Sequence, residues 1–281
     1  MANSSKMSAL EIRSSIVLAS IYALRMLGIF LILPVFAIYA SSLEVTPNAF
    51  QIGLALGIYG LTQALFQIPF GMSSDRFGRK KLIYFGLSLF ILGSLIAGLS
   101  NQIEGIIVGR AIQGSGAISA VLTAFLSDVT RDEHRTKAMA IIGVSIGLTF
   151  ALSLVISPIL SSVIGVPGIF LLMAILSMAA ILVIKFFVHE PSDLKKPTRV
   201  GYKDFFNILK RLDLNRLNFG IFVLHATQIS IFMVIPFYLV DQGQLNLEAH
   251  WTVYLPVLAI SFLCIVPIII FSERWGKNKK K

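Results

Sequence analysis

Residues 71–83 read Gly71-Met-Ser-Ser-Asp-Arg-Phe-Gly-Arg-Lys-Lys-Leu-Ile83, and this stretch decides the fold. It is a short turn with four basic side chains and one acid, and it separates two apolar stretches, Phe50–Met72 and Leu82–Leu99. Each apolar stretch has close to the roughly 20 residues that a helix needs to cross a bilayer. Short basic loops between such spans lie on the cytoplasmic side of membranes. The stretch therefore predicts a helical membrane protein with this turn in the cytoplasm.

The composition of the whole chain agrees with this prediction. Its 281 residues are 56% hydrophobic and 14% charged, and the mean hydropathy is +0.83. Soluble domains carry roughly 25% charged residues, so a soluble globular enzyme is excluded, and disorder would need the opposite composition. The single cysteine, Cys264, excludes a disulfide framework and a thiolate metal cluster.

Apolar stretches of spanning length recur along the chain without the two-residue alternation of a transmembrane β-barrel. Backbone polar groups inside a bilayer must be satisfied within each helix. We therefore expect an all-α polytopic membrane protein with eight spans. They are Ile16–Ala40, Phe50–Met72, Leu82–Leu99, Ile103–Leu126, Ala138–Val163, Ile169–Val188, Leu217–Val240 and Trp251–Phe271.

Basic residues are distributed unequally between the loops. Of the 24 Lys and Arg residues, 22 lie in the two terminal segments and in the loops after the second, fourth and sixth expected spans. The loops after the first, third, fifth and seventh spans contain none. The positive-inside rule places both termini in the cytoplasm. The net charge of +10 then reflects topology and contact with anionic lipid, which argues against a nucleic-acid partner.

The chain also contains an internal repeat. Ser74–Lys81 (SDRFGRKK) follows the second expected span, and the similar Ser272–Lys279 (SERWGKNK) follows the eighth. A six-span unit, a long cytoplasmic linker and a restarting second unit are typical of parallel transporter repeats. We expect a six-helix bundle over residues 1–188, a linker over 189–216 and part of a second bundle over 217–281. Four more spans would complete the second unit, so the chain is either the front part of a longer transporter or a genuine eight-helix product.

Within the linker, Tyr202–Leu212 places four apolar side chains on one helical face and lysines on the other. This pattern predicts a helix on the cytoplasmic membrane surface, and a solvated linker is the alternative.

Three motifs resemble those of the major facilitator superfamily, in its twelve-helix drug–proton antiporter branch. They are residues 71–83, which are similar to motif A; Ile106–Ala117 (IIVGRAIQGSGA), similar to motif B; and Leu27-Gly28 with Pro34-Val35, similar to the first-helix signature. The resemblance covers the whole chain. It implies the first eight helices of that fold and proton-coupled efflux of small molecules by alternating access, with the proton gradient as energy source and no bound cofactor. It also implies a multi-pass protein of the bacterial inner membrane.

In the family, motif A is thought to latch the cytoplasmic side against an acid at the end of the fourth helix, a position that Asp128 fits. Glycine permits the tight turn and close helix approach that such a latch needs. The expected latch residues are Gly71, Asp75, Arg76, Gly78, Arg79, Lys80 and Asp128. The alternative is a lipid-facing basic loop that only sets topology.

Two arginines, Arg25 and Arg110, lie inside expected spans, and every carboxylate lies in a loop or at a span end. An ionisable group inside a bilayer is costly and marks function by default. The resemblance links Arg110 to proton coupling, and Arg25 can bind an anionic or polar substrate. For both, carbonyl hydrogen bonds that tie helices together are the structural alternative.

His225 is the one side chain inside a span whose ordinary pKa is near neutral, so it is a candidate proton carrier. A satisfied structural histidine is the alternative. Polar side chains at helical spacing predict a cavity near the midplane for a small-molecule substrate. The expected lining residues are Tyr22, Arg25, Tyr59, Gln63, Gln67, Gln113 and Gln228. The pairs Gly53–Gly57 and Gly143–Gly147 are interpreted as helix-packing sites.

The fifth expected span differs from the motif of the antiporter branch, and this difference weakens the interpretation as an antiporter. The fifth span reads Ser153-Leu-Val-Ile-Ser-Pro158, with serines where the antiporter branch has glycines. A nutrient or sugar symporter, a non-transporting remnant and a homo-oligomer that supplies the missing wall are therefore kept as alternatives. No Walker loop, zinc site or nucleophile triad is present in the sequence, so neither an enzyme nor ATP-driven transport is expected.

Overall fold

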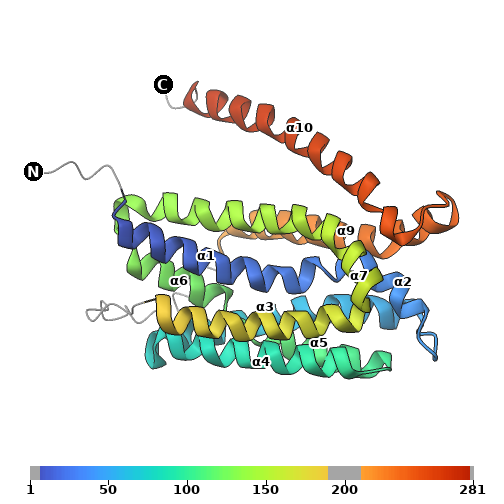
Figure 1. Cartoon of the computed structure of the whole chain (residues 1–281). Coiled ribbons are helices and arrows are strands. Elements are labelled where there is room, and N and C mark those ends of the chain that lie inside the picture. Colours follow the sequence, from blue (N-terminus) through green and yellow to red (C-terminus); the bar gives the residue numbers. More distant parts are fainter. Residues whose placement is uncertain (1–6, 189–209, 279–281) are drawn as a thin grey trace, which may run out of the picture.

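The computed structural model describes residues 7–188 and 210–278, and within those ranges every regular element is a helix (Figure 1). The elements are α1 (Ala9–Phe30), α2 (Leu33–Ser41), α3 (Ala49–Phe77), α4 (Arg79–Leu99), α5 (Ile103–Ser115), α6 (Ser119–Val129), η1 (Asp132–His134), α7 (Arg135–Phe187), α9 (Leu212–Asp241), η2 (Leu247–Ala249) and α10 (Trp251–Asn278).

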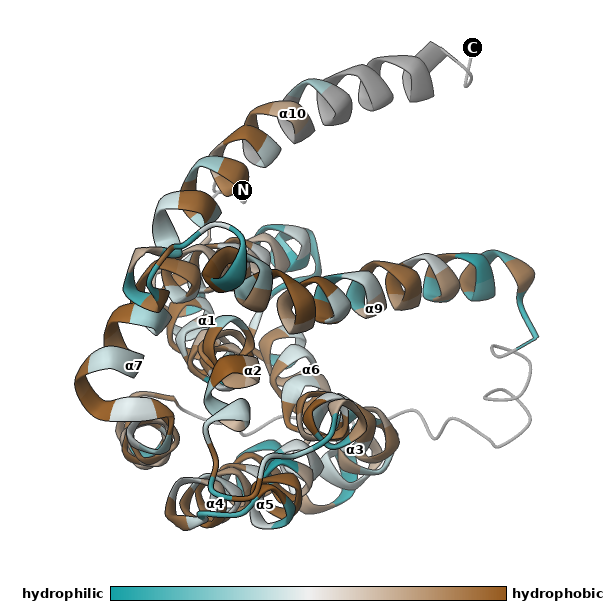
Figure 2. Cartoon of the chain, turned by 90° about the vertical axis from the view of Figure 1, so that its right-hand side faces the viewer, coloured by the Kyte–Doolittle hydropathy of each residue, from teal (hydrophilic) through white to brown (hydrophobic). Residues whose placement is uncertain are grey.

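The first seven α-helices form one antiparallel bundle. Helix α1 packs on α7, α4 packs on both α5 and α7, and α3 packs on α5. Helix α9 contacts mainly α2, and α10 contacts α7 and η2. Viewed along the bundle, α9 and α10 lie on one side of it and diverge from each other (Figure 2). One end of the bundle carries the basic turns at 76–81 and 131–137, and we call it the basic end.

Two of the long apolar segments contain a break in the helix. Within the first expected span the helix stops after Phe30 and restarts at Leu33 with Pro34 in its first turn, where a proline is tolerated. The fifth and sixth expected spans correspond to the two arms of the element α7. The chain reverses within α7 at Gly165 (Figure 1), where φ is 68° and ψ is 169°, a conformation that only glycine adopts without strain.

Six segments of the described chain are long and apolar enough to cross a membrane: Ala9–Ser41, Ala49–Phe77, Arg79–Leu99, Ile103–Val129, Asp132–Phe187 and Leu212–Asp241. The seventh expected span begins earlier than predicted, at Leu212 instead of Leu217. The eighth falls within α10, part of whose side chains lie outside the described set. Most of the expected surface helix at Tyr202–Leu212 also lies outside the described residues.

The buried interior consists of two apolar clusters separated by a polar layer. The cluster nearer the basic end takes Leu18 from α1 and Leu87 from α4, and the other takes Val35 from α2 and Ala97 from α4. The layer between them contains buried polar side chains from α1, α4, α5 and α6, namely Arg25, Ser94, Arg110, Gln113 and Ser119. Many large apolar side chains on the outside of the bundle are exposed, as lipid contact requires.

Close helix packing uses other glycines than those expected. A Cβ atom would meet nothing within 4 Å at Gly57, Gly143 or Gly147, so the interpretation of these residues as packing sites was wrong. The close approach is between α4 and α5. A Cβ atom at Gly93 would lie 2.5 Å from the backbone nitrogen of Gln113, and one at Gly109 would lie 2.6 Å from that of Ala97.

Candidate functional site

Arg110 occupies the centre of the polar layer, with 1% of its surface exposed. Its Nε donates to the carbonyl oxygen of Ala55 at 3.3 Å, and its Nη1 donates to that of Gly28 at 3.0 Å and to Gln113 Oε1 at 3.2 Å. These acceptors are uncharged and come from α3, α1 and α5. One guanidinium therefore connects three helices, and the partial negative charges on its acceptor oxygens compensate its positive charge.

Gln113 extends this network into α4 instead of lining an open cavity. Its Nε2 donates to Ser94 Oγ at 2.7 Å, and Ser94 in turn donates to the carbonyl oxygen of Phe90. Gln113 is completely buried between α4 and α5. The expectation that it lines the substrate cavity is therefore not met by its position in this structure.

Tyr59 of α3 lies beside both buried arginines. The Cζ atom of Arg110 is 4.8 Å from the centre of its ring, and that of Arg25 is 6.0 Å away. A guanidinium at these distances is attracted by the negative face of an aromatic ring, and the attraction strengthens where water is excluded. The Tyr59 hydroxyl is buried and has no hydrogen-bond partner among the described residues.

Arg25 of α1 is also 1% exposed, but it is less well satisfied than Arg110. Its Nη1 donates to Ser119 Oγ at 3.1 Å, while its Nη2 has only a long contact of 3.5 Å with Gln63 Oε1. Its Nε finds no acceptor in the described part of the chain.

Gln63 and Gln67 follow Tyr59 at one-turn intervals along α3, and both are half-buried. The Oε1 atom of Gln67 has no partner within the described ranges. Tyr22 is half-buried and packs against the apolar cluster nearer the basic end. The row of polar side chains on α3 thus includes two members, Tyr59 and Gln63, that lie next to Arg25.

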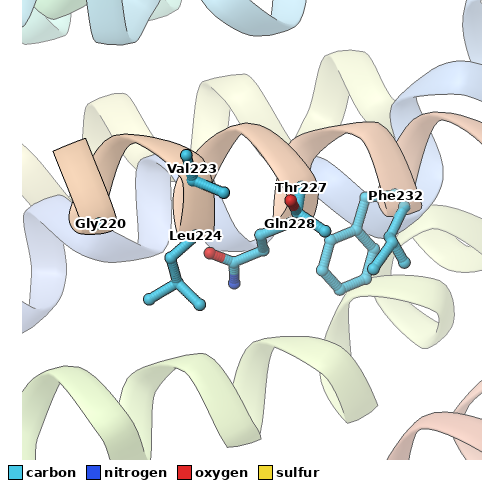
Figure 3. A pocket seen from close by; sticks show the side chains of 7 residues that line it. Gly220, Val223, Leu224, Thr227, Gln228 and Phe232 are labelled. Atoms are coloured by element: carbon cyan, nitrogen blue, oxygen red, sulfur yellow. The ribbon is translucent and has the colours of Figure 1, made fainter.

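A groove of about 580 Å³ runs along the middle of α9 (Figure 3). Its lining is mostly apolar and includes Gly220, Val223, Leu224, Ile231 and Phe232, with Thr227 and Gln228 as the polar members. Leu224 and Gln228 point to the same side of the helix (Figure 3). Gln228 therefore lines a groove formed by α9, and its place in a substrate cavity stays a prediction.

Helix α9 touches α3 where Met233 faces Gly53. A Cβ atom at Gly53 would lie 3.7 Å from Met233 Sδ. Viewed along the bundle, α9 runs at a steep angle to the other helices and away from them (Figure 2).

His225 is not among the residues that line the groove. Its side chain is exposed, and its Nδ1 lies 2.9 Å from the backbone carbonyl oxygen of Ile221 in the previous turn. The structure therefore does not bring His225 together with the two arginines.

The basic end is held by a cluster of ionic contacts. Arg79 Nε donates to Asp128 Oδ2 at 2.8 Å, and Arg79 Nη1 contacts Asp75 Oδ1 and Ser74 Oγ. Gly78 between α3 and α4 has a φ of 98°, which favours glycine. Of the other expected latch residues, Arg76 lies over the ring of Phe77, Lys80 is half-exposed, and Gly71 faces Ala120 at an ordinary contact distance.

A second ionic contact at this end was missed in the sequence. Glu11 is 5% exposed and accepts hydrogen bonds from the backbone nitrogen, Nε and Nη2 of Arg131 at 3.0, 3.1 and 3.0 Å. These bonds raise the pKa of Arg131 above its ordinary value. Ser8 and Glu11 form a capping box at the start of α1, and the Ser-x-x-Glu spacing is a sequence signal for that motif. The loop after α6 is thereby fixed to α1, three residues beyond Asp128.

Comparison with known proteins identifies the family. The sequence profile described as Major Facilitator Superfamily matches residues 18–281. The chain belongs to the major facilitator superfamily.

Among members of the superfamily, the inner membrane transport protein YajR of Escherichia coli (strain K12) is 46% identical over 280 residues, which are 99% of this chain and 61% of YajR. An uncharacterized transporter of Buchnera aphidicola subsp. Schizaphis graminum is 42% identical over 261 residues, 92% of this chain and 66% of the relative. The chain thus spans slightly less than two thirds of the length of these relatives.

A solved structure has the same fold at much lower sequence identity. A bacterial homologue of the human lysosomal transporter Spinster, in an inward-facing and unoccupied conformation, is 16% identical with a TM-score of 0.75, and the match covers 92% of this chain and 61% of the homologue. The expected all-α major facilitator fold is confirmed.

Proposed function

We propose that this chain belongs to a secondary active transporter that moves small molecules across the bacterial inner membrane by alternating access. The observation that carries the proposal is the polar layer inside the bundle, where two fully buried arginines lie beside the polar row of α3 with no carboxylate from the described residues next to them. A permanent polar layer at this depth is costly in a membrane protein. It supports a solute pathway, since a purely structural core would be more stable if it were apolar.

The proposed energy source is the proton gradient, and the proposed direction is efflux with both termini in the cytoplasm. Support comes from the positive charge of the basic end and from Arg110, whose network joins α1, α3 and α5. Protonation elsewhere can change the position of these helices through such a shared hydrogen-bond donor. The role of His225 as proton carrier stays a prediction.

The proposed latch is the Arg79–Asp128 contact at the basic end, which joins the start of α4 to the end of α6. Alternating access requires this end to open and close. A partly exposed ion pair suits a contact that must break reversibly, because its net stabilisation is small.

Flux into proteoliposomes tests the proposal. The purified chain is reconstituted with a pH-sensitive dye inside, a proton gradient is imposed, and a panel of neutral, cationic and anionic solutes is added one at a time. Coupled transport dissipates the gradient only with a transported solute, and an Arg110→Gln variant should lose this effect. Solute movement with the proton gradient would indicate a symporter instead of efflux.

His225→Gln is measured in the same assay. Loss of coupling with retained solute binding is expected if His225 carries the proton, whereas unchanged coupling would exclude that role. Proteoliposomes that show no proton-dependent movement of any solute would overturn the proposed transport function and favour a non-transporting protein.

A further inference from the structure

We propose that the solute bound in this bundle carries a carboxylate, and that Arg25 binds it through the Nε–Nη2 edge of its guanidinium. The inference rests on the proposed transport function for its biological meaning, but binding itself can be measured without transport. The site consists of Arg25 and its two hydrogen-bonding neighbours, Gln63 and Ser119.

The first step is the charge balance of the polar layer. Within the described ranges, every carboxylate lies in a loop or close to a helix end. Those whose side chains are described are Glu11, Glu44, Asp75, Glu104, Asp128, Asp132, Glu133, Asp213, Asp241 and Glu248. Two buried guanidiniums therefore share the interior without an anion. Burying a cation away from water costs several kcal/mol unless a partner compensates it, so the layer favours an anionic guest.

The second step is the difference between the two arginines. Arg110 makes three hydrogen bonds at 3.0–3.3 Å, which use its Nε and its Nη1. Arg25 makes one bond of ordinary length, from Nη1 to Ser119 Oγ. Of the two guanidiniums, it is Arg25 that has a buried nitrogen, Nε, without a partner among the described residues.

The Arg25 donors that lack a close partner lie along one edge of its guanidinium. In a guanidinium, the Nε–H and one Nη2–H point the same way and form a planar fork. In Arg25 the Nε has no partner in the described chain, and Nη2 has only the 3.5 Å contact with Gln63. A carboxylate fits such a fork with two parallel charge-assisted hydrogen bonds. Ser119 holds the opposite corner of the guanidinium and so fixes the orientation of the fork.

A carboxylate must be able to reach the Nε–Nη2 edge of Arg25. Gln63 is half-buried and covers the fork with the end of a flexible side chain. Its long contact with Nη2 is a weak hydrogen bond, so a carboxylate can displace it at small cost.

Benzoate and benzamide form a matched pair of probes, because they have the same ring and nearly the same shape but differ in charge. The full chain is purified in detergent, and its thermal unfolding is followed by light scattering with each compound at equal concentration and ionic strength. A ligand that binds the folded state raises Tm by mass action. Benzoate is expected to raise Tm by several degrees, and benzamide is expected to have no effect.

Three variants test the assignment to Arg25. Arg25→Lys keeps the charge but lacks the fork, and it should weaken benzoate binding at least about tenfold. Gln63→Ala removes the competing amide, and it should strengthen benzoate binding. Arg13→Gln removes an arginine near the start of the same helix that lies over the Phe187 ring, and it should leave the benzoate shift unchanged.

Equal shifts with benzoate and benzamide, or full benzoate binding in Arg25→Lys, would overturn the inference. Weaker benzoate binding in Gln63→Ala would also contradict it, and this variant retains Arg25 if Arg25→Lys does not fold. Benzoate binding without proteoliposome flux would leave this site standing and overturn the transport proposal. Proton-coupled flux of a neutral solute, together with no effect of benzoate on Tm, would support the transport proposal and overturn the carboxylate site at Arg25.

Discussion

Arg79 and Asp128 are separated by 49 positions in the sequence, and their side chains meet with Nε 2.8 Å from Oδ2. Arg79 is the first residue of α4, and Asp128 is the next-to-last residue of α6. The Glu11–Arg131 contact fixes the loop that follows α6 to α1. Two ion pairs thus connect the ends of three helices at the basic end, where the proposed transporter must open.

Loss of the Asp128 charge should loosen the basic end. Asp128→Asn keeps the size of the side chain but removes the ion pair. The pair is only partly buried, with 12% of the Arg79 and 27% of the Asp128 side chain exposed, so we expect a loss of about 1 kcal/mol. In a Cys264→Ser background, a cysteine placed at the buried Leu126 should then react severalfold faster with a maleimide.

Asp132→Asn is the matched control for this measurement, because its ion pair with Arg135 is much more exposed. It should leave the labelling rate unchanged. Equal acceleration in both variants would show that general charge, and not the Arg79–Asp128 contact, holds this end closed.

Arg110→Lys should destabilise the bundle. A lysine ammonium cannot reach the carbonyl oxygens of Gly28 and Ala55 and the amide of Gln113 at once, so buried acceptors lose their donor. Each unsatisfied buried group costs about 1–3 kcal/mol, and we expect a loss of about 2 kcal/mol or more in unfolding free energy. Thermal unfolding in detergent measures it. An unchanged Tm would mean that the three acceptors are satisfied in another way.

Gly93→Ala should disrupt the contact between α4 and α5. The new methyl group would overlap with backbone atoms of Gln113, which cannot move independently of α5. Overpacking of this kind costs about 1–3 kcal/mol. Gly143→Ala is the matched control, since a Cβ atom there meets nothing within 4 Å. It should be neutral or stabilising, because alanine is the better helix former. Thermal unfolding of both variants checks the difference, and similar losses would contradict it.

His250 should make stability depend on pH. Its side chain is buried beside Tyr254 at the end opposite the basic end, and burial lowers its pKa below the ordinary value. Below about pH 6.5 the unfolded chain binds a proton at this residue that the folded chain takes up less readily. Stability from this residue is therefore present at neutral pH and is lost as the pH falls.

The decrease in Tm between neutral pH and about pH 5.5 should become smaller in His250→Gln. His225→Gln, which changes an exposed histidine, should retain the full decrease. The same decrease in wild type and His250→Gln would show that other groups cause it.

Much of the candidate site could be predicted from residue type and position. Arg25 and Arg110 are charges inside apolar stretches, and Tyr59, Gln63 and Gln67 recur at helical spacing, so each was visible without coordinates. Asp128 was predicted through the resemblance to the family. Glu11 was missed as a contact of Arg131, because a carboxylate before the first apolar stretch has the pattern of an ordinary exposed residue.

Sequence alone determined the class of the protein, because crossing a bilayer imposes length and hydropathy on each helix and a charge bias on the loops between them. It could not determine which glycines bring helices together or how Gln113 is used, since these depend on which helix faces which. Only the tertiary structure decided that Arg110 is satisfied by carbonyl oxygens from other helices while Arg25 keeps an open edge. The physical reason is that a buried hydrogen bond depends on distances between segments far apart in the chain, which no local pattern encodes.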